Sequence, residues 1–413
     1  MRIILTIVRG GPIRPTRHKF KLVLLAGLSV VLLAGCGNDS GAPKDAGQGD
    51  DSVDNQSAAN EARQSVFLKS AIEQVIVPGY TQMAEATATL VDHAQTFCDQ
   101  RNQTGFEQVG SQWRAAMARW QAMRWLAHGP VRFAHRFDRI EGWPRATAAA
   151  VKTRVDMLIA QAGSPTAEPM TLALIEQQPI QAQGFPALEY LLFGPAKLAD
   201  FTTEPGADRR CEMLVAVARN LASMSLALRN EWNGTQTEGV PDEFGRGLLG
   251  SRTEPILTMF NVLANQMRGS LAEVRREKLG GPLGLTGTES APSPNVLNLQ
   301  SSRSETSLDH VRGSLAAIEQ LFQRDAGNFA GLLEDSDQAL ALARFAQSFE
   351  AARAQAQRLH DDGISLTQAF STPALVDRAV QLYEAVKALD EIWLDPVMPA
   401  AGATPSFNFN DGD

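Results

Sequence analysis

The chain has 413 residues, of which 44% are apolar, 20% charged and 7% aromatic. That length allows two ordinary domains or one double-sized unit, and the apolar share excludes collagen-like and wholly disordered chains. Three cysteines are too few for a disulfide framework or a cysteine-rich metal cluster. The net charge of −8 argues against a nucleic-acid partner, which needs a basic patch.

The first 35 residues are predicted to be a targeting segment outside the fold. They carry six basic residues and no acid, so the rest of the chain has 32 basic residues against 46 acidic ones. Their apolar run, residues 22–33, spans about 18 Å at ~1.5 Å per residue, which is short of a ~30 Å bilayer core. It ends in Leu33-Ala34-Gly35-Cys36, which resembles a bacterial lipobox. The alternative is an ordinary signal peptide followed by a chance cysteine.

A lipobox implies cleavage before Cys36 and acylation of that residue, which anchors a protein to a membrane without spanning it. Gly37 in the next position, by resemblance to Gram-negative sorting, favours the outer membrane and a body that faces the periplasm. Residues 36–60 are rich in Gly, Asp, Ser and Asn and nearly free of large apolar groups. We expect them to form a flexible acidic tether, because they bury too little surface to offset the entropy of ordering.

The body, residues 61–413, is predicted to be all-α with essentially no sheet. Proline is absent from residues 79–129, 206–240 and 295–372, which leaves room for long helices. Apolar residues recur at helical spacing, and good helix formers dominate these stretches. The expected helices lie near residues 62–98, 106–127, 145–162, 170–178, 186–193, 208–232, 244–278, 305–328, 335–361, 366–371 and 375–394.

Two helical halves are expected, at about residues 61–235 and 236–413. Residues 279–304 form the longest stretch without a helical pattern, and they are interpreted either as a boundary between halves or as a loop over a site. Pro78, inside the first long helix, is expected to kink it.

Two cysteines remain after Cys36, at positions 98 and 211. In an oxidising periplasm Cys98 and Cys211 can pair, and a loop of about 110 residues closed in this way gains up to roughly 4.7 kcal/mol in the chain-entropy model. Two buried thiols are the alternative, because the sequence does not give the distance between them.

The segment that carries most chemistry is GFPALEYLLFG, residues 184–194. Its one acid, Glu189, sits in an apolar run, with Pro186 expected at the first helical position. Burying an unpaired carboxylate is costly, so Glu189 needs an Arg, a cation or a proton. One reading is a site carboxylate. The other is a helix residue satisfied by backbone amides and a nearby Arg.

This segment resembles the signature of the imelysin family, a Gly-x-His-x-x-Glu motif followed by an apolar Tyr-Leu-Leu-Phe-Gly run. The resemblance extends over most of the body. Further matches, in chain order, are residues 74–98, 113–130, Trp143-Pro144, 303–322 with their Arg-Ser-x-x-Ser-Leu pattern, and 407–413. The family implies an all-α fold of two packed bundles.

The resemblance also implies a function and shows a departure from it. The family was named for a metallopeptidase activity, and related members act in bacterial iron uptake, where the motif His and Glu are proposed to bind metal. Gly184 and Glu189 match the motif, but Pro186 replaces its His and offers no donor atom. Of the motif pair only Glu189 remains as a candidate ligand for iron or another divalent metal. No catalytic residue is assigned.

The remaining candidates for a site are weaker. Residues 132–145, which include Glu141, concentrate charge and could line a site beside Glu189, or form a solvated loop; the candidates carried forward are Arg132, His135, Arg136, Asp138 and Arg139. The tryptophans are expected to pack in the core and the scattered histidines to bind no metal; they are Trp113, Trp120, Trp125, Trp143, His93, His128, His135, His310 and His360.

Taken together, the sequence predicts a lipid-anchored, periplasm-facing binding component in iron acquisition or envelope metal handling, with envelope iron-uptake proteins as partners. A divergent metallopeptidase of the M75 type is one alternative. A partner-binding envelope lipoprotein without a metal site is the other.

Overall fold

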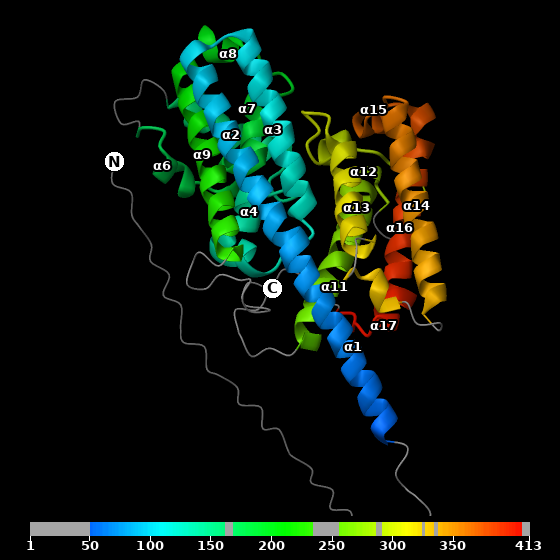
Figure 1. Ribbon diagram of the computed structural model, residues 1–413. Coiled ribbons are helices and arrows are strands. Elements are labelled where there is room, and N and C mark those ends of the chain that lie inside the picture. Colours follow the sequence, from blue (N-terminus) through cyan, green and yellow to red (C-terminus); the bar gives the residue numbers. More distant parts are fainter. Residues whose placement is uncertain are drawn as a thin grey trace, which may run out of the picture. The chain divides into compact units, whose positions relative to one another are not determined.

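The computed structural model describes most of the body. The described residues are 50–161, 168–233, 256–285, 291–323, 327–333 and 338–406, with side chains from Ala58 on. They form helices and no strand, as the all-α prediction requires (Figure 1). The leader, Cys36 and residues 407–413 lie outside them.

The first long helix continues through the position of Pro78. α1 (Asp50–Ser70) leads into a π-helical turn (Ala71–Ile76) and then into α2 (Val77–Gln100). The backbone N–H of Val77 bonds to the carbonyl of Ile72, five residues back. Pro78 follows at the start of α2, so the expected disturbance takes the form of a π turn and leaves the helix unbroken. α1 also begins before residue 60, the expected end of the tether.

The first half packs around α2. α3 (Gln103–Met123) and α9 (Ala207–Trp232) lie along α2, and α5 (Ala148–Ala160) and α7 (Gly184–Leu192) complete this half (Figure 1). Short elements connect them, namely 3₁₀ turns at Gly129–His135 and Ile180–Ala182, α4 (Arg136–Ile140), α6 (Leu172–Glu176) and α8 (Ala199–Thr202).

The described part of the second half contains four longer helices and a shared aromatic core. Its elements are α11 (Ile256–Glu273), a π turn (Val274–Gly280), α12 (Gly281–Leu283), a 3₁₀ turn (Val296–Asn298), α13 (Ser307–Gln323), a 3₁₀ turn (Ala330–Leu333), α14 (Ala339–Asp361), α15 (Leu366–Ser371), a 3₁₀ turn (Pro373–Leu375), α16 (Val376–Ile392), a π turn (Trp393–Val397) and α17 (Met398–Ala400). Phe322, Phe329, Phe345 and Trp393 contact one another with ring centroids 4.0 to 6.1 Å apart. Burial of these aromatic rings is a large share of what holds this half together.

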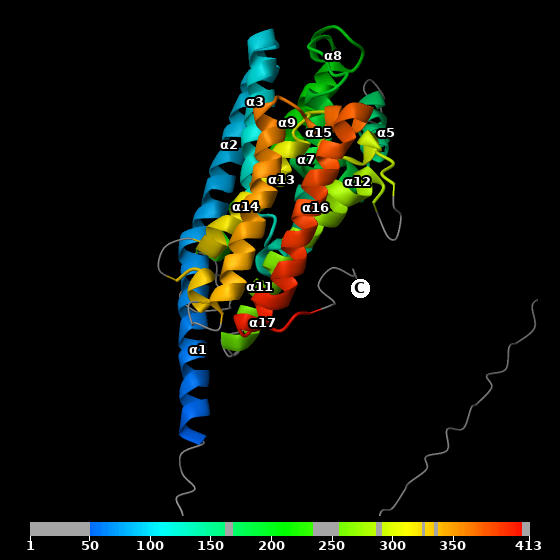
Figure 2. The same ribbon diagram turned by 90° about the vertical axis from the view of Figure 1, so that its right-hand side faces the viewer.

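The two halves belong to one compact unit, which begins at Asp51. α13 of the second half packs along α3 of the first (Figure 2). Buried apolar side chains from both halves form one continuous core cluster. Within the segment 279–304, the described residues include α12 and the 3₁₀ turn at Val296–Asn298.

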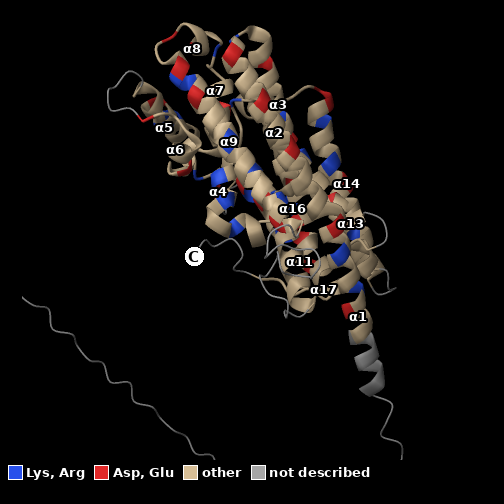
Figure 3. Cartoon of the chain, turned by 60° about the vertical axis from the view of Figure 1, so that its left-hand side comes forward, with Lys and Arg blue, Asp and Glu red and all other residues tan. Residues whose placement is uncertain are grey.

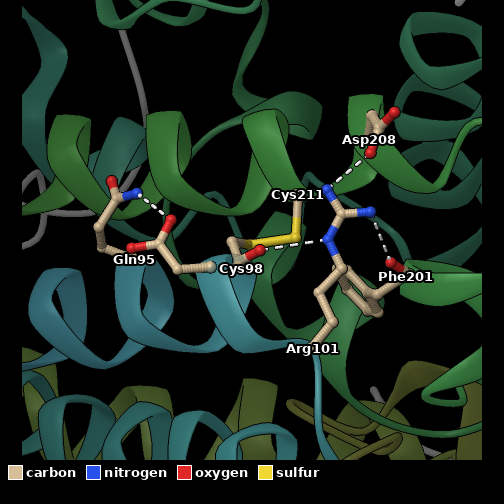
Figure 4. The surroundings of a disulfide bond; sticks show 7 residues. Gln95, Cys98, Arg101, Phe201, Asp208 and Cys211 are labelled. Carbon is tan, nitrogen blue, oxygen red and sulfur yellow. Dashed lines mark hydrogen bonds and ion pairs between the residues drawn. A yellow bond between two sulfur atoms is a disulfide. The ribbon is translucent and has the colours of Figure 1, made fainter.

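The structure joins Cys98, near the end of α2, to Cys211, in the first turn of α9, in a disulfide with Cα atoms 5.5 Å apart (Figure 4). Arg101 caps α2 in a left-handed conformation. Its guanidinium donates to the carbonyls of Cys98 and Phe201 and pairs with Asp208 at 2.6 Å. The bridge and this arginine together tie α2 to α9 at one end of the first half.

α9 is long and apolar enough to cross a membrane by length and composition alone, but 67% of its most apolar window is buried in the body. It is a core helix of the first half. Figure 3 shows acidic and basic residues interspersed along the helices, with basic residues gathered around α4.

Candidate functional site

A cavity of about 230 Å³ lies where the two halves meet. The first half lines it with Met117 of α3, with Glu141 and Trp143, and with residues of α7 that include Glu189. The second half contributes Glu277 of the π turn after α11, and it contributes Gly281, Pro282 and residues 297–303. Described residues of the segment 279–304 thus form one wall of this cavity.

α7 can approach this cavity because its first residue is glycine. Gly184 has a φ of +60°, and a Cβ there would lie 2.1 Å from the carbonyl oxygen of Ile140 and 2.4 Å from that of Arg139. α7 thus begins at Gly184, two residues before the expected start, and Pro186 is its third residue. The missing N–H of Pro186 costs no intrahelical bond there, because the first turn has no partners for its donors.

Glu189 is buried in the cavity wall, with 6% of the residue exposed. Its Oε1 accepts hydrogen bonds from the backbone N–H and from the hydroxyl of Ser304, both at 2.9 Å. Among the described residues, its Oε2 accepts no hydrogen bond and no Lys or Arg forms an ion pair with it. Burial raises the pKa of Glu189, and the bonds from Ser304 and the charge of Arg303 oppose that rise.

A line of polar groups leads from Glu189 into the second half. The Ser304 hydroxyl contacts the Thr306 hydroxyl at 2.9 Å, and Thr306 contacts Nε2 of His310 at 3.1 Å. His310 is buried, and burial, together with the charges of Lys278 and Arg124, holds its pKa well below the usual range. His310 is therefore a neutral core histidine whose Nε2 is engaged by Thr306.

Glu141 lies in the same cavity wall but is fully engaged. Its Oε2 accepts from the Trp120 indole at 2.6 Å, from Gln121 at 3.1 Å and from Arg124 at 3.0 Å, and its Oε1 accepts from Gln300 at 2.6 Å. The sequence placed this carboxylate in the charged segment 132–145, and in the structure it is satisfied by groups from both halves.

Arg124 and Lys278 neutralise the acids behind that wall. Arg124 also donates to Glu273 at 2.8 Å, and Lys278 bonds to Gln121 at 2.6 Å and to Ser314 at 2.8 Å. Burial lowers the pKa of Lys278 to about 8, although Glu273 opposes this shift. Burial raises the pKa of Glu273, but Arg124 and Lys278 outweigh it and leave that pKa lowered. Two cations thus balance Glu141 and Glu273, and the cluster has no net charge.

The five side chains proposed to line the site lie elsewhere. Arg132 and His135 are exposed, and Arg136 forms a bidentate pair with Glu231 at 2.7 and 2.8 Å. Asp138 pairs with Arg145, and Arg139 bonds to Gln183 and Asn220. Of the segment 132–145, the residues that reach the cavity are Glu141, Trp143 and Pro144. The density of charged residues along the sequence did not show which side chains of the segment 132–145 face the cavity.

Three of the four tryptophans are placed as expected. Trp113, Trp120 and Trp125 are buried in the core, whereas Trp143 is half-buried and lines the cavity. The histidines are dispersed over different elements. Within the described part of the chain, no three His, Cys, Asp or Glu side chains come together in a way that could hold a metal ion.

The donor set therefore does not fit a bare divalent ion. A protein zinc site takes three or four protein ligands, whereas the cavity offers Glu189 with one oxygen already engaged, Glu141 with both oxygens engaged, and the exposed Glu277. Pro186 stands where the family motif has its His. The wall can accept hydrogen bonds and compensate one positive charge.

Comparison with known proteins defines the class. Residues 76–392 match the imelysin family, peptidase M75. The chain belongs to this family.

One relative is similar in sequence and two solved structures are similar in fold. The chain is 26% identical over 220 residues to "Iron-regulated protein A" of Synechococcus elongatus, and it spans about half of that relative's length, 54% of it. An imelysin-like protein from Psychrobacter arcticum has a similar fold, with a TM-score of 0.66 at 14% identity over 84% of this chain and 98% of that one. A putative iron-regulated protein A precursor from Parabacteroides distasonis has a TM-score of 0.61 at 16% identity, over 81% of this chain and 95% of that one.

Proposed function

We propose that this chain is a non-catalytic binding component of the cell envelope, which acts in iron acquisition or a related metal-handling process. Family membership and the printed name of the Synechococcus relative support the association with iron. The lipobox at Cys36 and the Gly37 that follows it support a lipid anchor in the outer membrane and a body that faces the periplasm.

One observation carries the non-catalytic part of the proposal. The cavity keeps the motif acid Glu189 in its wall, with Oε2 free to accept a hydrogen bond, while Pro186 removes the motif His. A wall of this kind binds a ligand, but it lacks the three ligands and open position that a metallopeptidase needs. Envelope iron-uptake proteins are the partners that this role implies.

Growth under iron limitation tests the process. Cells that lack the gene should grow more slowly than wild type when iron is chelated, and equally well when iron is abundant. Re-expression of the wild-type chain or of Glu176→Gln, an exposed acid on α6, should restore growth. Glu189→Gln should fail to restore it, and Cys36→Ser should fail through loss of anchoring.

Two results would overturn the proposal. One is equal growth of the deletion strain and wild type under iron limitation. The other is chelator-sensitive cleavage of an unfolded protein by the purified chain that is lost in Glu189→Gln, because it would identify a metallopeptidase.

A further inference from the structure

The cavity contains an acid whose environment is incomplete. Glu189 is buried in the cavity wall and is held on one oxygen by Ser304. Its other oxygen has no partner among the described residues. Burial of a carboxylate costs free energy unless a cation pairs with it or a proton neutralises it. The ligand of this site is thus expected to bring a positive charge and at least one hydrogen-bond donor.

The charges around the cavity point the same way. Glu189 and Glu277 are acidic and Arg303 is basic, while Glu141 is balanced by Arg124. Arg303 is partly occupied, since it donates to the carbonyl of Ala148 at 2.9 Å and lies 5.2 Å from the centre of the Tyr190 ring. The cavity groups therefore sum to one negative charge, which matches a single cationic group.

The walls suit an aliphatic chain. Met117 and Phe185 are buried beside Glu189, and Trp143 and Leu299 line the same space. Leu297 also lines it and is 71% exposed, although it is a large apolar residue. At about 230 Å³ the space is smaller than the ~300–1,000 Å³ of pockets for drug-sized molecules. It suits one side chain or a small molecule with an apolar stem.

We infer that the cavity between the two halves binds an aliphatic ammonium group, with the nitrogen at Oε2 of Glu189 and the methylene stem against Met117, Phe185 and Leu297. An ammonium brings three donors and its own charge, so it needs one free carboxylate oxygen and not the three ligands of a bare metal ion. The exposed Glu277 lies at the open side of the same cavity, where it attracts the ligand. The inference rests on the binding role proposed for this cavity.

Two sources can supply such a group, a small free diamine or a lysine side chain of a protein partner. Calorimetric titration separates them, with the soluble chain from Gly37 onward as the receptor. The probes are 1,5-diaminopentane, Nα-acetyl-lysine methylamide, the uncharged 1,5-pentanediol, and Fe(II) and Zn(II) salts. Binding of the lysine derivative in preference to the diamine indicates a protein partner, and the reverse preference indicates a free diamine.

Variants place the binding at the cavity. Glu189→Gln should bind the ammonium probe at least about tenfold more weakly, because it removes a desolvated charge partner. Glu277→Gln should lose about two- to fivefold, and that loss should shrink at high salt because Glu277 is exposed. Glu176→Gln is the matched control and should bind like wild type. A thermal melt of each variant establishes that it is folded.

Three results would overturn the inference: no saturable binding of either ammonium probe, equal binding of 1,5-pentanediol, or ammonium binding that is unchanged in Glu189→Gln. Saturable iron or zinc binding that depends on Glu189 and excludes the ammonium probe would also overturn it, but would leave the proposed role in iron acquisition standing. Conversely, the purified chain could bind the ammonium probe while deletion of its gene has no effect under iron limitation. That result would support ammonium binding and contradict the proposed role in iron acquisition.

Discussion

Glu141 and Glu189 are two buried carboxylates in the wall of one cavity, and their surroundings differ. Glu141 receives four hydrogen bonds, one of them from Arg124. Glu189 receives two, both from Ser304 and both on one oxygen. The first acid is completed by the protein, and it joins the two halves. The second is left for something else to complete, which is the pattern expected when binding is favoured over stability.

The largest effect is expected from a substitution of Arg124, the cation that pairs with Glu141. Arg124→Met leaves the buried Glu141 and the half-buried Glu273 with Lys278 as their one remaining cation, and we expect the free energy of unfolding to fall by about 3–5 kcal/mol. Arg119→Met, on the exposed face of the same helix, should change it by less than ~0.5 kcal/mol. Urea denaturation measures both, and a loss at Arg124 no larger than that at Arg119 would show that the cluster contributes nothing.

Removal of the disulfide separates stability from the cavity. Cys98→Ala with Cys211→Ala releases a cross-link between residues 113 apart, and the free energy of unfolding should fall by about 2–4 kcal/mol. The bridge lies between α2 and α9 and lines no part of the cavity. The folded variant should therefore bind the ligand with an affinity within about twofold of wild type. Loss of binding in a variant that is still folded would contradict this separation.

Gly184 brings α7, and with it Glu189, next to the segment that carries Glu141. Gly184→Ala adds a Cβ within 2.1 Å of a backbone carbonyl and requires a left-handed alanine. We expect a loss of about 2–3 kcal/mol in unfolding free energy. Gly363→Ala has a similar φ of +66° and open space around its Cβ, so it should lose about 1 kcal/mol. Equal losses would mean that close approach at Gly184 costs nothing.

The smallest expected effect is the pH dependence of the stability contributed by Glu189. Burial raises the pKa of Glu189 in the folded state, so the folded protein binds that proton more tightly than the unfolded chain does. Its contribution to stability is therefore full below the ordinary carboxyl pKa and is lost as the pH rises through the raised one. At neutral pH we expect Glu189→Gln to be as stable as wild type or more stable by about 1 kcal/mol.

The matched substitution at the other acid should do the opposite. Glu141→Gln leaves Arg124 and its neighbours with a weaker acceptor, and it should cost about 1–3 kcal/mol at neutral pH. Chemical denaturation of both variants across pH 4 to 8 measures the pair. A Glu189→Gln variant that is the less stable of the two at pH 7 would contradict the assignment of roles.

The long helices could be predicted from the sequence because their signals are local. Proline gaps and apolar spacing placed α9 and α15 almost to the residue, at 208–232 against Ala207–Trp232 and at 366–371. Short elements such as α4 and α8 were missed, because a single helical turn has no period of its own and depends on packing. The start of α7 was misplaced because Gly184 is set by contact with residues 139 and 140, distant in sequence.

The site could be predicted in part. Glu189 stood out as a lone acid in an apolar run, and it does lie in the cavity wall. Its partner Ser304 was noticed within the Arg-Ser-x-x-Ser-Leu match but given no role, since nothing in the sequence links positions 115 residues apart. Glu141 was noticed within the charged segment 132–145 but not separated from its neighbours, because only the fold shows that Arg136 and Arg139 bond to other partners while Glu141 faces Arg124.

The most direct test of the different roles of the two acids is a crystal structure of the chain grown with 1,5-diaminopentane. The account predicts one ammonium nitrogen about 2.7–2.9 Å from Oε2 of Glu189, with the hydrogen bonds of Glu141 unchanged. A diamine bound elsewhere, or one that displaces Arg124 from Glu141 and leaves Glu189 without a partner, would contradict it.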